Sequence, residues 1–322
     1  MEPAEPLAAR IARELEQPAP RAAEILTEAI LGRHGDAVVA VIFYGSCLRK
    51  HTHEGVLDFY VVVDDYRNAY RSFYLRTVNA LVPPNVFFLS QDSELGPLRC
   101  KYAVISRAAF ERGVSPESYV PYFWARFSQP ALLAYARDDD ARRLALQACV
   151  QSVLTLVQRL GAFLPARGAV QRFSAAALWQ EALRRTYSAE LRTESPETVR
   201  GHYDADAERY DAVTGPALET LRQRGWLDEV HARGPAFEVH MAPARRRGAR
   251  IRWQLARPFA KGLAFVRLLK NATTVGDWVP YILWKLERHI GRPVEMTERQ
   301  RRHPFLFGWP VLVRLLWRRD IF

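Results

Sequence analysis

The sequence is poor in cysteine and has no long apolar run. Its three cysteines, Cys47, Cys100 and Cys149, lie far apart among 322 residues and form no CxxC pair. This spacing predicts neither a disulfide framework nor a zinc site, and it favours a reducing cytosol. No apolar run approaches the roughly 18 residues of a membrane-spanning helix. The first 20 residues contain acids and lack an apolar core, so we expect no secretory signal or transit peptide.

Lysine is also scarce, because only five of the 46 basic residues are lysine. The formal net charge of +11 is unevenly distributed. From residue 231 onward there are 19 Arg and Lys against 6 Asp and Glu, whereas the first 230 residues carry a net charge of −2. The basic C-terminal third therefore predicts an anionic partner, and either an anionic membrane surface or nucleic acid fits this asymmetry.

The first third of the chain combines helices with short apolar strands. With 49% hydrophobic and 25% charged residues, the composition is that of a folded protein, and the length predicts two or three domains. Periodicity and turn residues predict an α+β unit of about 110 residues. Its expected helices are 7–16, 21–33 and 69–81, and its expected strands are 36–44, 56–63, 86–89 and 98–106.

The rest of the chain is predicted to be mainly helical. Residues 216–224, followed by Gly225, Trp226 and Leu227, resemble a helix that runs into the wing of a winged-helix module. We expect three domains, with residues 1–115 forming the α+β unit, 116–258 a helical, winged-helix-like unit, and 259–322 a basic helical region. The other expected features are helices at 138–163, 173–192, 259–270 and 278–289, and a basic linker at 242–250.

One segment carries recognisable chemistry. It reads FYGSCLRKHTHEGVLDFYVVV, and it places Gly45 and Ser46 directly after one strand and Asp58 on the next. A tight Gly-Ser turn allows backbone N–H groups and a hydroxyl to approach a triphosphate closely. An aspartate on the adjacent strand supplies an oxygen ligand for Mg²⁺. This layout is that of a nucleotidyltransferase fold, in which the metal neutralises phosphate charge during in-line displacement of pyrophosphate.

The usual pattern has a second acid two residues after the first, on the same face of the strand. Here that position is Tyr60, so any further metal ligand must come from elsewhere. Asp92 and Glu94, which we expect beside the third and fourth strands, are the candidates. Glu54, in the loop before the second strand, is a weaker one.

The sequence resembles the mitochondrial translocator-assembly-and-maintenance type of phosphatidate cytidylyltransferase and its bacterial relatives. The similarity runs in order over most of residues 40–300, but only its first two motifs are specific. Gln129 stands where the family has lysine, which removes a cation from the expected phosphate site. The matching segments are Tyr44-Gly45-Ser46-Cys47, Asp58-Phe59, Lys101-Tyr102-Ala103-Val104 and the stretch from Tyr122 to Pro130.

The resemblance implies that CTP and phosphatidic acid react, with Mg²⁺, to give CDP-diacylglycerol and pyrophosphate. It implies that Tyr44, Gly45, Ser46 and Lys101 bind the nucleotide and that Asp58 binds the metal. The catalytic residues would be Asp58, Lys101 and Arg126, the last two steadying phosphate charge. No general base is required, because a phosphate monoester is already an anionic nucleophile at neutral pH. Glu190 is a weaker candidate neighbour of the phosphate site.

The last 19 residues, 304–322, interleave aromatic and aliphatic residues with arginine. Such a segment can lie in the bilayer interface, and a C-terminal helix docked on the core is the alternative. We expect a cytoplasmic enzyme, peripheral on the inner face of the cell membrane, with no obligatory protein partner and no nucleic-acid partner. The expected membrane-contact residues are Trp309, Arg314, Trp317, Arg318 and Arg319.

Two rival functions stay open. One is a nucleotidyltransferase with a non-lipid acceptor, such as a sugar phosphate, RNA or a protein, in which the basic C-terminal third would bind nucleic acid. The other is a degenerate, non-catalytic nucleotide-binding protein, which Tyr60 at the second acidic position favours.

Overall fold

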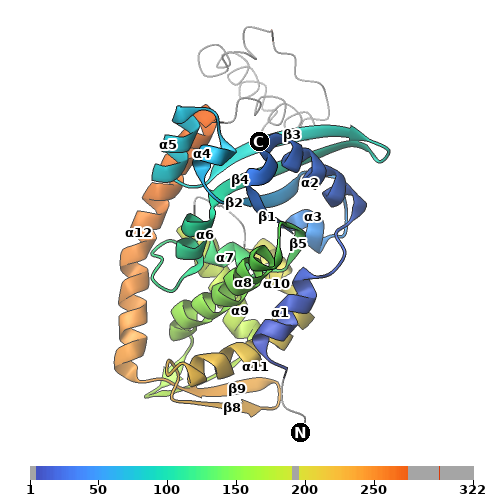
Figure 1. Cartoon of the computed structure of the whole chain (residues 1–322). Helices are drawn as coiled ribbons and strands as arrows, with labels where there is room; N and C mark the ends of the chain where they lie inside the picture. The colour runs from blue at the N-terminus through green and yellow to red at the C-terminus, as the bar shows by residue number, and fades with distance from the viewer. Residues whose placement is uncertain (1–4, 191–195, 275–296, 298–322) are drawn as a thin grey trace, which may run out of the picture.

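A computed structural model describes residues 5–190, 196–274 and 297 of the chain (Figure 1). Within those residues, the helices are α1 (Leu7–Leu15), α2 (Arg21–His34), α3 (Ser46–Arg49), α4 (Tyr66–Ala69), α5 (Phe73–Leu81), α6 (Arg107–Val114), α7 (Trp124–Phe127), α8 (Asp139–Leu160), α9 (Ala175–Ala189), α10 (Pro196–Asp204), α11 (Ala207–Gln223) and α12 (Pro243–Thr274). The strands are β1 (Val38–Tyr44), β2 (Leu57–Val63), β3 (Asn85–Ser93), β4 (Gly96–Ser106), β5 (Ala131–Ala136), β6 (Ala166–Arg167), β7 (Val170–Ser174), β8 (Glu229–Arg233) and β9 (Ala236–His240).

Five strands form a mixed sheet in the order β3-β4-β2-β1-β5. β2 and β4 are parallel, and the other neighbouring pairs are antiparallel. The predicted α+β class is confirmed, and each of the four predicted strands corresponds to one of these five. The edge strand β5 was not predicted, and it comes from residues beyond position 115.

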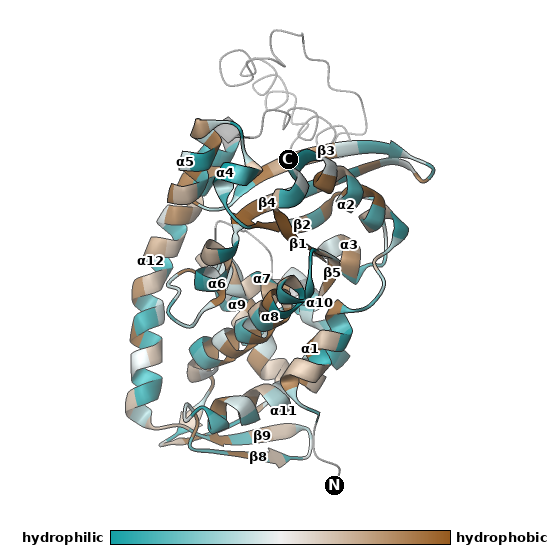
Figure 2. Ribbon diagram, viewed as in Figure 1, coloured by the Kyte–Doolittle hydropathy of each residue, from teal (hydrophilic) through white to brown (hydrophobic). Residues whose placement is uncertain are grey.

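Side chains of the central strands alternate between two apolar layers, as a sheet buried on both faces requires. Phe59 and Val61 of β2 pack with α2 on one face. Tyr60 and Val62 pack with α8 on the other. Figure 2 shows the resulting apolar colour of the central strands. The helices that cover the sheet thus come from both the N-terminal and the middle part of the chain.

A helical region and a second sheet make up the other end of the molecule (Figure 1). This sheet is antiparallel, with the order β6-β7-β9-β8. α9 contacts β7, and α11 contacts β8. The predicted helix at 216–224 is the second half of α11, and the predicted helix at 173–192 begins only at Ala175, because residues 170–174 form β7.

The basic stretch 242–250 is not a linker, because it forms the first turns of α12. Arginine and alanine are strong helix formers, and proline is favoured at a first helical position, as Pro243 is here. The predicted helix at 259–270 belongs to the same 32-residue helix. α12 runs from the small sheet to α5 (Figure 1). The predicted helix at 278–289 lies outside the described residues.

β3 continues to Ser93 and β4 begins at Gly96, so both strands extend further toward each other than the predicted ranges 86–89 and 98–106. Their long hairpin extends beyond the body of the sheet (Figure 1). Among the described helices, none combines the length and the apolar character needed to cross a membrane.

Candidate active site

The Gly-Ser turn directly follows β1. Gly45 has φ +93°, a backbone conformation that residues other than glycine rarely adopt. A Cβ on Gly45 would lie 2.7 Å from Oδ2 of Asp58, so the backbone of the turn lies directly against this carboxylate. Ser46 then begins the single turn α3 and is exposed. The first N–H groups of a helix have no intrahelical acceptor, so this turn presents hydrogen-bond donors.

Asp58 and Lys101 face each other across two neighbouring strands. They are direct partners in the parallel pairing of β2 and β4, and Nζ of Lys101 lies 2.8 Å from Oδ1 of Asp58. Tyr44 is paired with Asp58 on the opposite side. Register therefore gathers Tyr44, Gly45, Asp58 and Lys101, all predicted nucleotide-site or metal-site residues, where β1 ends and β2 begins.

Tyr60 shares the face of Asp58, as alternation predicts, but it belongs to the core. Its side chain is fully buried. Its ring packs edge-on against Phe127 at a centroid distance of 4.9 Å and lies tilted against Tyr44 at 5.4 Å. Burial raises the pKa of the Tyr60 phenol well above its ordinary value. A neutral phenol in this environment replaces the second carboxylate of the nucleotidyltransferase pattern.

The structure does not bring Asp92 and Glu94 to Asp58. Phe88 is the residue of β3 that is level with Lys101, and Asp92 is four residues further along, level with Pro97. Four residues of a strand span about 13 Å, too far for Asp92 to share an ion with Asp58. Glu94 lies at the hairpin turn and forms an ion pair with Arg21 at 3.2 Å. The weaker candidate Glu54 is exposed in the loop before β2.

Asp58 is thus the carboxylate available to a metal at the Gly45 turn. Within the described part of the chain, no three His, Cys, Asp or Glu side chains form a metal-binding group. Mg²⁺ is commonly held by one or two carboxylates together with substrate phosphates and water. A single half-buried aspartate beside a turn that can accept phosphates fits such an ion, whereas a site formed by protein ligands alone does not fit.

Arg126 forms a buried two-pronged ion pair. Its Nη1 and Nη2 atoms lie 2.9 Å and 3.0 Å from Oε1 and Oε2 of Glu190, and Nη1 also donates to the carbonyl of Tyr122. The side chains of Arg126 and Glu190 are only 10% and 12% exposed. Burial opposes the charge of Arg126, but Glu190 and the neighbouring tyrosines outweigh it and raise the pKa of the guanidinium.

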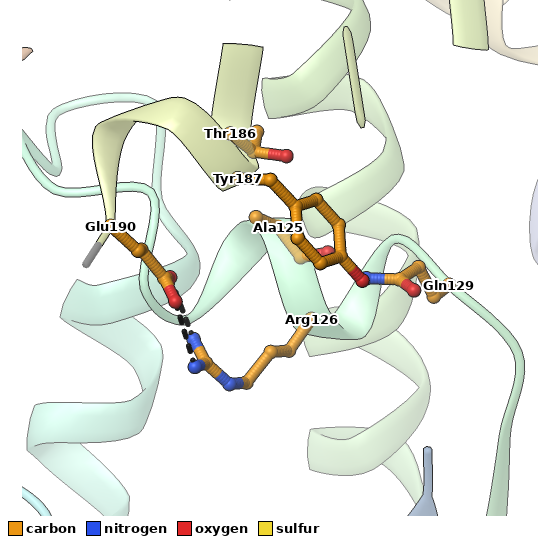
Figure 3. Close-up of a pocket in the computed structure, with 6 residues that line it drawn as sticks. All are labelled: Ala125, Arg126, Gln129, Thr186, Tyr187 and Glu190. Carbon is orange, nitrogen blue, oxygen red and sulfur yellow. Dashed lines mark hydrogen bonds and ion pairs between the residues drawn. The ribbon is translucent and has the colours of Figure 1, made fainter. Parts of the chain in front are cut away.

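These two residues line a pocket between α7 and α9 (Figure 3). Its volume is about 220 Å³, including the space at its open mouth. Figure 3 shows the phenol of Tyr187 and the amide of Gln129 pointing toward one another on the other side of the pocket. The lining residues are Ala125, Arg126, Gln129, Thr186, Tyr187 and Glu190. The sequence analysis identified Arg126 and Glu190 but not Thr186 or Tyr187, because no local motif marks these two residues as neighbours of Arg126.

Arg49 is a further residue of the site that the sequence patterns did not identify. It ends α3, one turn after Gly45, and its Nη1 donates to Oε1 of Gln129 at 3.2 Å. The Nε2 atom of Gln129 in turn donates to the carbonyl of Ala125 at 2.8 Å. The cation that the resemblance places at position 129 is therefore absent there, but a different cation contacts the residue that replaces it.

Two cations of the basic C-terminal third are buried rather than presented to a partner. The guanidinium of Arg267 lies 4.0 Å from the ring centroid of Tyr122, and its Nε donates to the carbonyl of Pro83 at 2.9 Å. Lys270 donates to the carbonyls of Val82, at 2.6 Å, and Pro84. Through these hydrogen bonds, the C-terminal part of α12 packs against the turn between α5 and β3.

The predicted membrane-contact residues Trp309, Arg314, Trp317, Arg318 and Arg319 lie outside the described residues. The sequence matches no protein-family model and no curated protein.

Proposed function

We propose that this protein is a magnesium-dependent nucleotidyltransferase, and that it transfers a cytidylyl group from CTP to phosphatidic acid. The observation that carries the proposal is the contact between the Gly45 turn and the carboxylate of Asp58. Gly45 lacks a Cβ where one would collide with Asp58 Oδ2 at 2.7 Å. A phosphate chain and a carboxylate-bound cation could therefore meet at the same point.

The residues around this turn have separate roles in the proposed reaction. The backbone N–H groups of the turn, the hydroxyl of Ser46 and the ammonium of Lys101 would bind the triphosphate. Asp58 would hold Mg²⁺ jointly with the triphosphate. The bound ion would supply neutralisation of phosphate charge. Lys101, 2.8 Å from Asp58 at the same sheet edge, would orient the phosphates and offset the charge on the departing pyrophosphate.

The choice of a lipid acceptor depends on the family resemblance and on one surface. Along α12, apolar side chains are exposed on successive turns, which is unusual for a surface that faces only water. Exposed Arg257 and Lys261 lie in the same part of the sequence but on other faces of the helix. Figure 2 shows apolar residues along the part of α12 next to α5. We call these residues the α12 stripe, which consists of Ile251, Leu255, Phe259, Val266 and Leu269.

A helix with one apolar face and cations on its other faces is typical of helices that lie in the membrane interface. We therefore propose that the enzyme is cytoplasmic and peripheral on the inner face of the cell membrane. In this proposal the five-stranded sheet with its Gly45 turn is a nucleotidyltransferase-type domain. The helices α9 to α11 with the β8–β9 hairpin are a winged-helix-like domain.

A second candidate function is a non-catalytic nucleotide-binding protein. The buried, apolar packing of Tyr60 at the second acidic position favours it, because one carboxylate is left where catalytic members of the pattern have two. Such a protein would bind CTP with Mg²⁺ and release no pyrophosphate.

The deciding experiment is pyrophosphate release from CTP with Mg²⁺, with and without vesicles that contain phosphatidic acid. Asp58→Ala is compared with Asp92→Ala, a matched control whose carboxylate is level with Pro97 and away from the Gly45 turn. Release that needs both the lipid and Asp58, and that survives in Asp92→Ala, supports the proposal. Binding of CTP without release under any condition would favour the second candidate.

A further inference from the structure

Arg49 differs from the other cations around the candidate site in its electrostatic surroundings. Lys101 is paired with Asp58, and Arg126 with Glu190. Arg49 forms no ion pair with any carboxylate in the described part of the chain, and its guanidinium contacts the neutral amide of Gln129. Among the described residues, no carboxylate is therefore in direct contact with this guanidinium.

Arg126 is poorly suited to bind a further anion. Its Nη1 and Nη2 atoms both donate to Glu190, and Nη1 also donates to the carbonyl of Tyr122. Its side chain is only 10% exposed. A phosphate at Arg126 would have to compete with a two-pronged carboxylate already in place.

The position of Arg49 relative to the Gly45 turn is fixed at both ends. At the backbone, its N–H donates to the carbonyl of Gly45 at 3.2 Å, so the side chain starts one helical turn from the residue that contacts Asp58. At the guanidinium, Gln129 accepts from Nη1, and Gln129 is itself held by Ala125. A half-buried arginine restrained in this way loses less conformational entropy on binding an anion than a free surface side chain would.

Asp206, the residue directly before α11, is a charged group that interacts electrostatically with Arg49. Asp206 is half-buried, and burial raises the pKa of its carboxyl while Arg49 and Arg209 lower it. Arg209 is paired with Glu14 at 2.8 Å. Asp206 is thus a described carboxylate that opposes an anion at Arg49.

We propose that Arg49 is a phosphate-binding residue of this site and that Gln129 is its positioning residue. This inference rests on the proposed function. The ligand chemistry is a phosphate group bearing at least one full negative charge. It comes either from the triphosphate of the nucleotide or from the headgroup of phosphatidic acid, and the arms of the experiment separate these two sources.

The test is calorimetric binding to the full chain with three probes. These are CTP with Mg²⁺, inorganic tripolyphosphate, and phosphatidylcholine vesicles with or without phosphatidic acid. Arg49→Ala should weaken binding of the probe whose phosphate contacts Arg49 by about 10- to 100-fold, the range expected for a charged hydrogen bond. Arg49→Lys should recover part of the loss. Lys50→Ala, which removes the adjacent exposed cation, should bind as the wild type does.

Variants of Gln129 test whether this residue positions Arg49 for phosphate binding or only supports the fold. Gln129→Glu places a carboxylate against Arg49, so it should weaken phosphate binding as severely as Arg49→Ala does. Gln129→Ala should weaken it by less, and the double variant Arg49→Ala/Gln129→Ala should be no weaker than Arg49→Ala alone, since coupled residues are not additive. Urea unfolding of each variant checks that the fold is retained.

If Arg49→Ala weakens binding of CTP and tripolyphosphate alone, the phosphate bound by Arg49 belongs to the nucleotide. If it weakens binding of vesicles with phosphatidic acid alone, the phosphate belongs to the lipid. Unchanged binding of all probes by Arg49→Ala, or equal weakening by Lys50→Ala, would overturn the inference, as would a wild type that binds none of the probes. Arg49-dependent binding of tripolyphosphate without pyrophosphate release from CTP would overturn the proposed catalytic function and leave this inference standing.

Discussion

Arg126 on α7 and Glu190 at the end of α9 are 64 residues apart in sequence and form a two-pronged ion pair, with N–O distances of 2.9 Å and 3.0 Å. The pair joins the short helix that precedes β5 to the helical region. Because both side chains are nearly buried, each depends on the other for compensation of its charge.

Removal of Glu190 should therefore destabilise the protein strongly. Glu190→Ala leaves the Arg126 guanidinium buried without a counter-charge, and the free energy of unfolding should fall by about 3–5 kcal/mol. Urea denaturation measures this. The double variant Arg126→Met/Glu190→Leu should recover much of the loss, because it removes both charges. A loss below about 1 kcal/mol in Glu190→Ala would show that the pair contributes little.

A side chain at Gly45 should impair both folding and activity. Gly45→Ala combines a positive φ with a Cβ that meets Asp58 Oδ2 at 2.7 Å. The backbone strain costs about 1–3 kcal/mol, and displacement of the Asp58 carboxylate should abolish Mg²⁺-dependent pyrophosphate release. Gly168→Ala is the matched control, because Gly168 also has a positive φ but nothing lies within 4 Å of its added Cβ. Equal activity in the two variants would contradict a role for the Gly45–Asp58 contact.

Lys270 should make stability depend on pH in the neutral to alkaline range. Burial, and secondarily Arg267, lowers the pKa of Lys270 to about 7, from 10.5 for an exposed lysine. Between these values the unfolded chain binds more protons at this site, so the free energy of unfolding should rise with pH from about 7 to about 10.

Lys270→Met lacks this group and serves as the reference. The stability of the wild type relative to Lys270→Met should be constant below about pH 6 and should increase toward about pH 9.5, as measured by urea unfolding. Parallel pH profiles for the two proteins would show that Lys270 keeps an ordinary pKa.

The α12 stripe should contribute to membrane binding. Leu255→Glu and Phe259→Glu replace side chains that are 65% and 60% exposed, so they should leave the fold intact. In a flotation assay with anionic vesicles, each should reduce the bound fraction several-fold, because burial of such a side chain contributes about 1.5–3 kcal/mol. Leu95→Glu, at the β3–β4 hairpin turn, is the matched control. Reduction by Leu95→Glu to the same extent would indicate a general charge effect.

Local sequence patterns predicted four of the five strands of the mixed sheet, but they missed β5 and mispredicted the start of α12. The apolar runs of β1, β2 and β4 are buried on both faces, so they are recognisable without knowledge of their partners. β5 was missed because Ala131–Ala136 is short and follows a helix-rich stretch. The run of arginines at the start of α12 predicts a linker by its charge, whereas the high helix propensity of arginine and alanine agrees with the observed helix.

Local sequence and tertiary packing each determined a different part of the candidate site. The sequence by itself determined the Gly45-Ser46 turn and the strand that carries Asp58, because these depend on residue type, strand period and short-range spacing. The pairing of Lys101 with Asp58 depends instead on the register of β2 and β4. Only the tertiary structure decided which distant residues join them. It separated Asp92 and Glu94 from Asp58 through strand register, and it brought Arg49 to Gln129 and Arg126 to Glu190 through helix packing. Contacts of this kind depend on how elements far apart in the chain pack together, which no local pattern specifies.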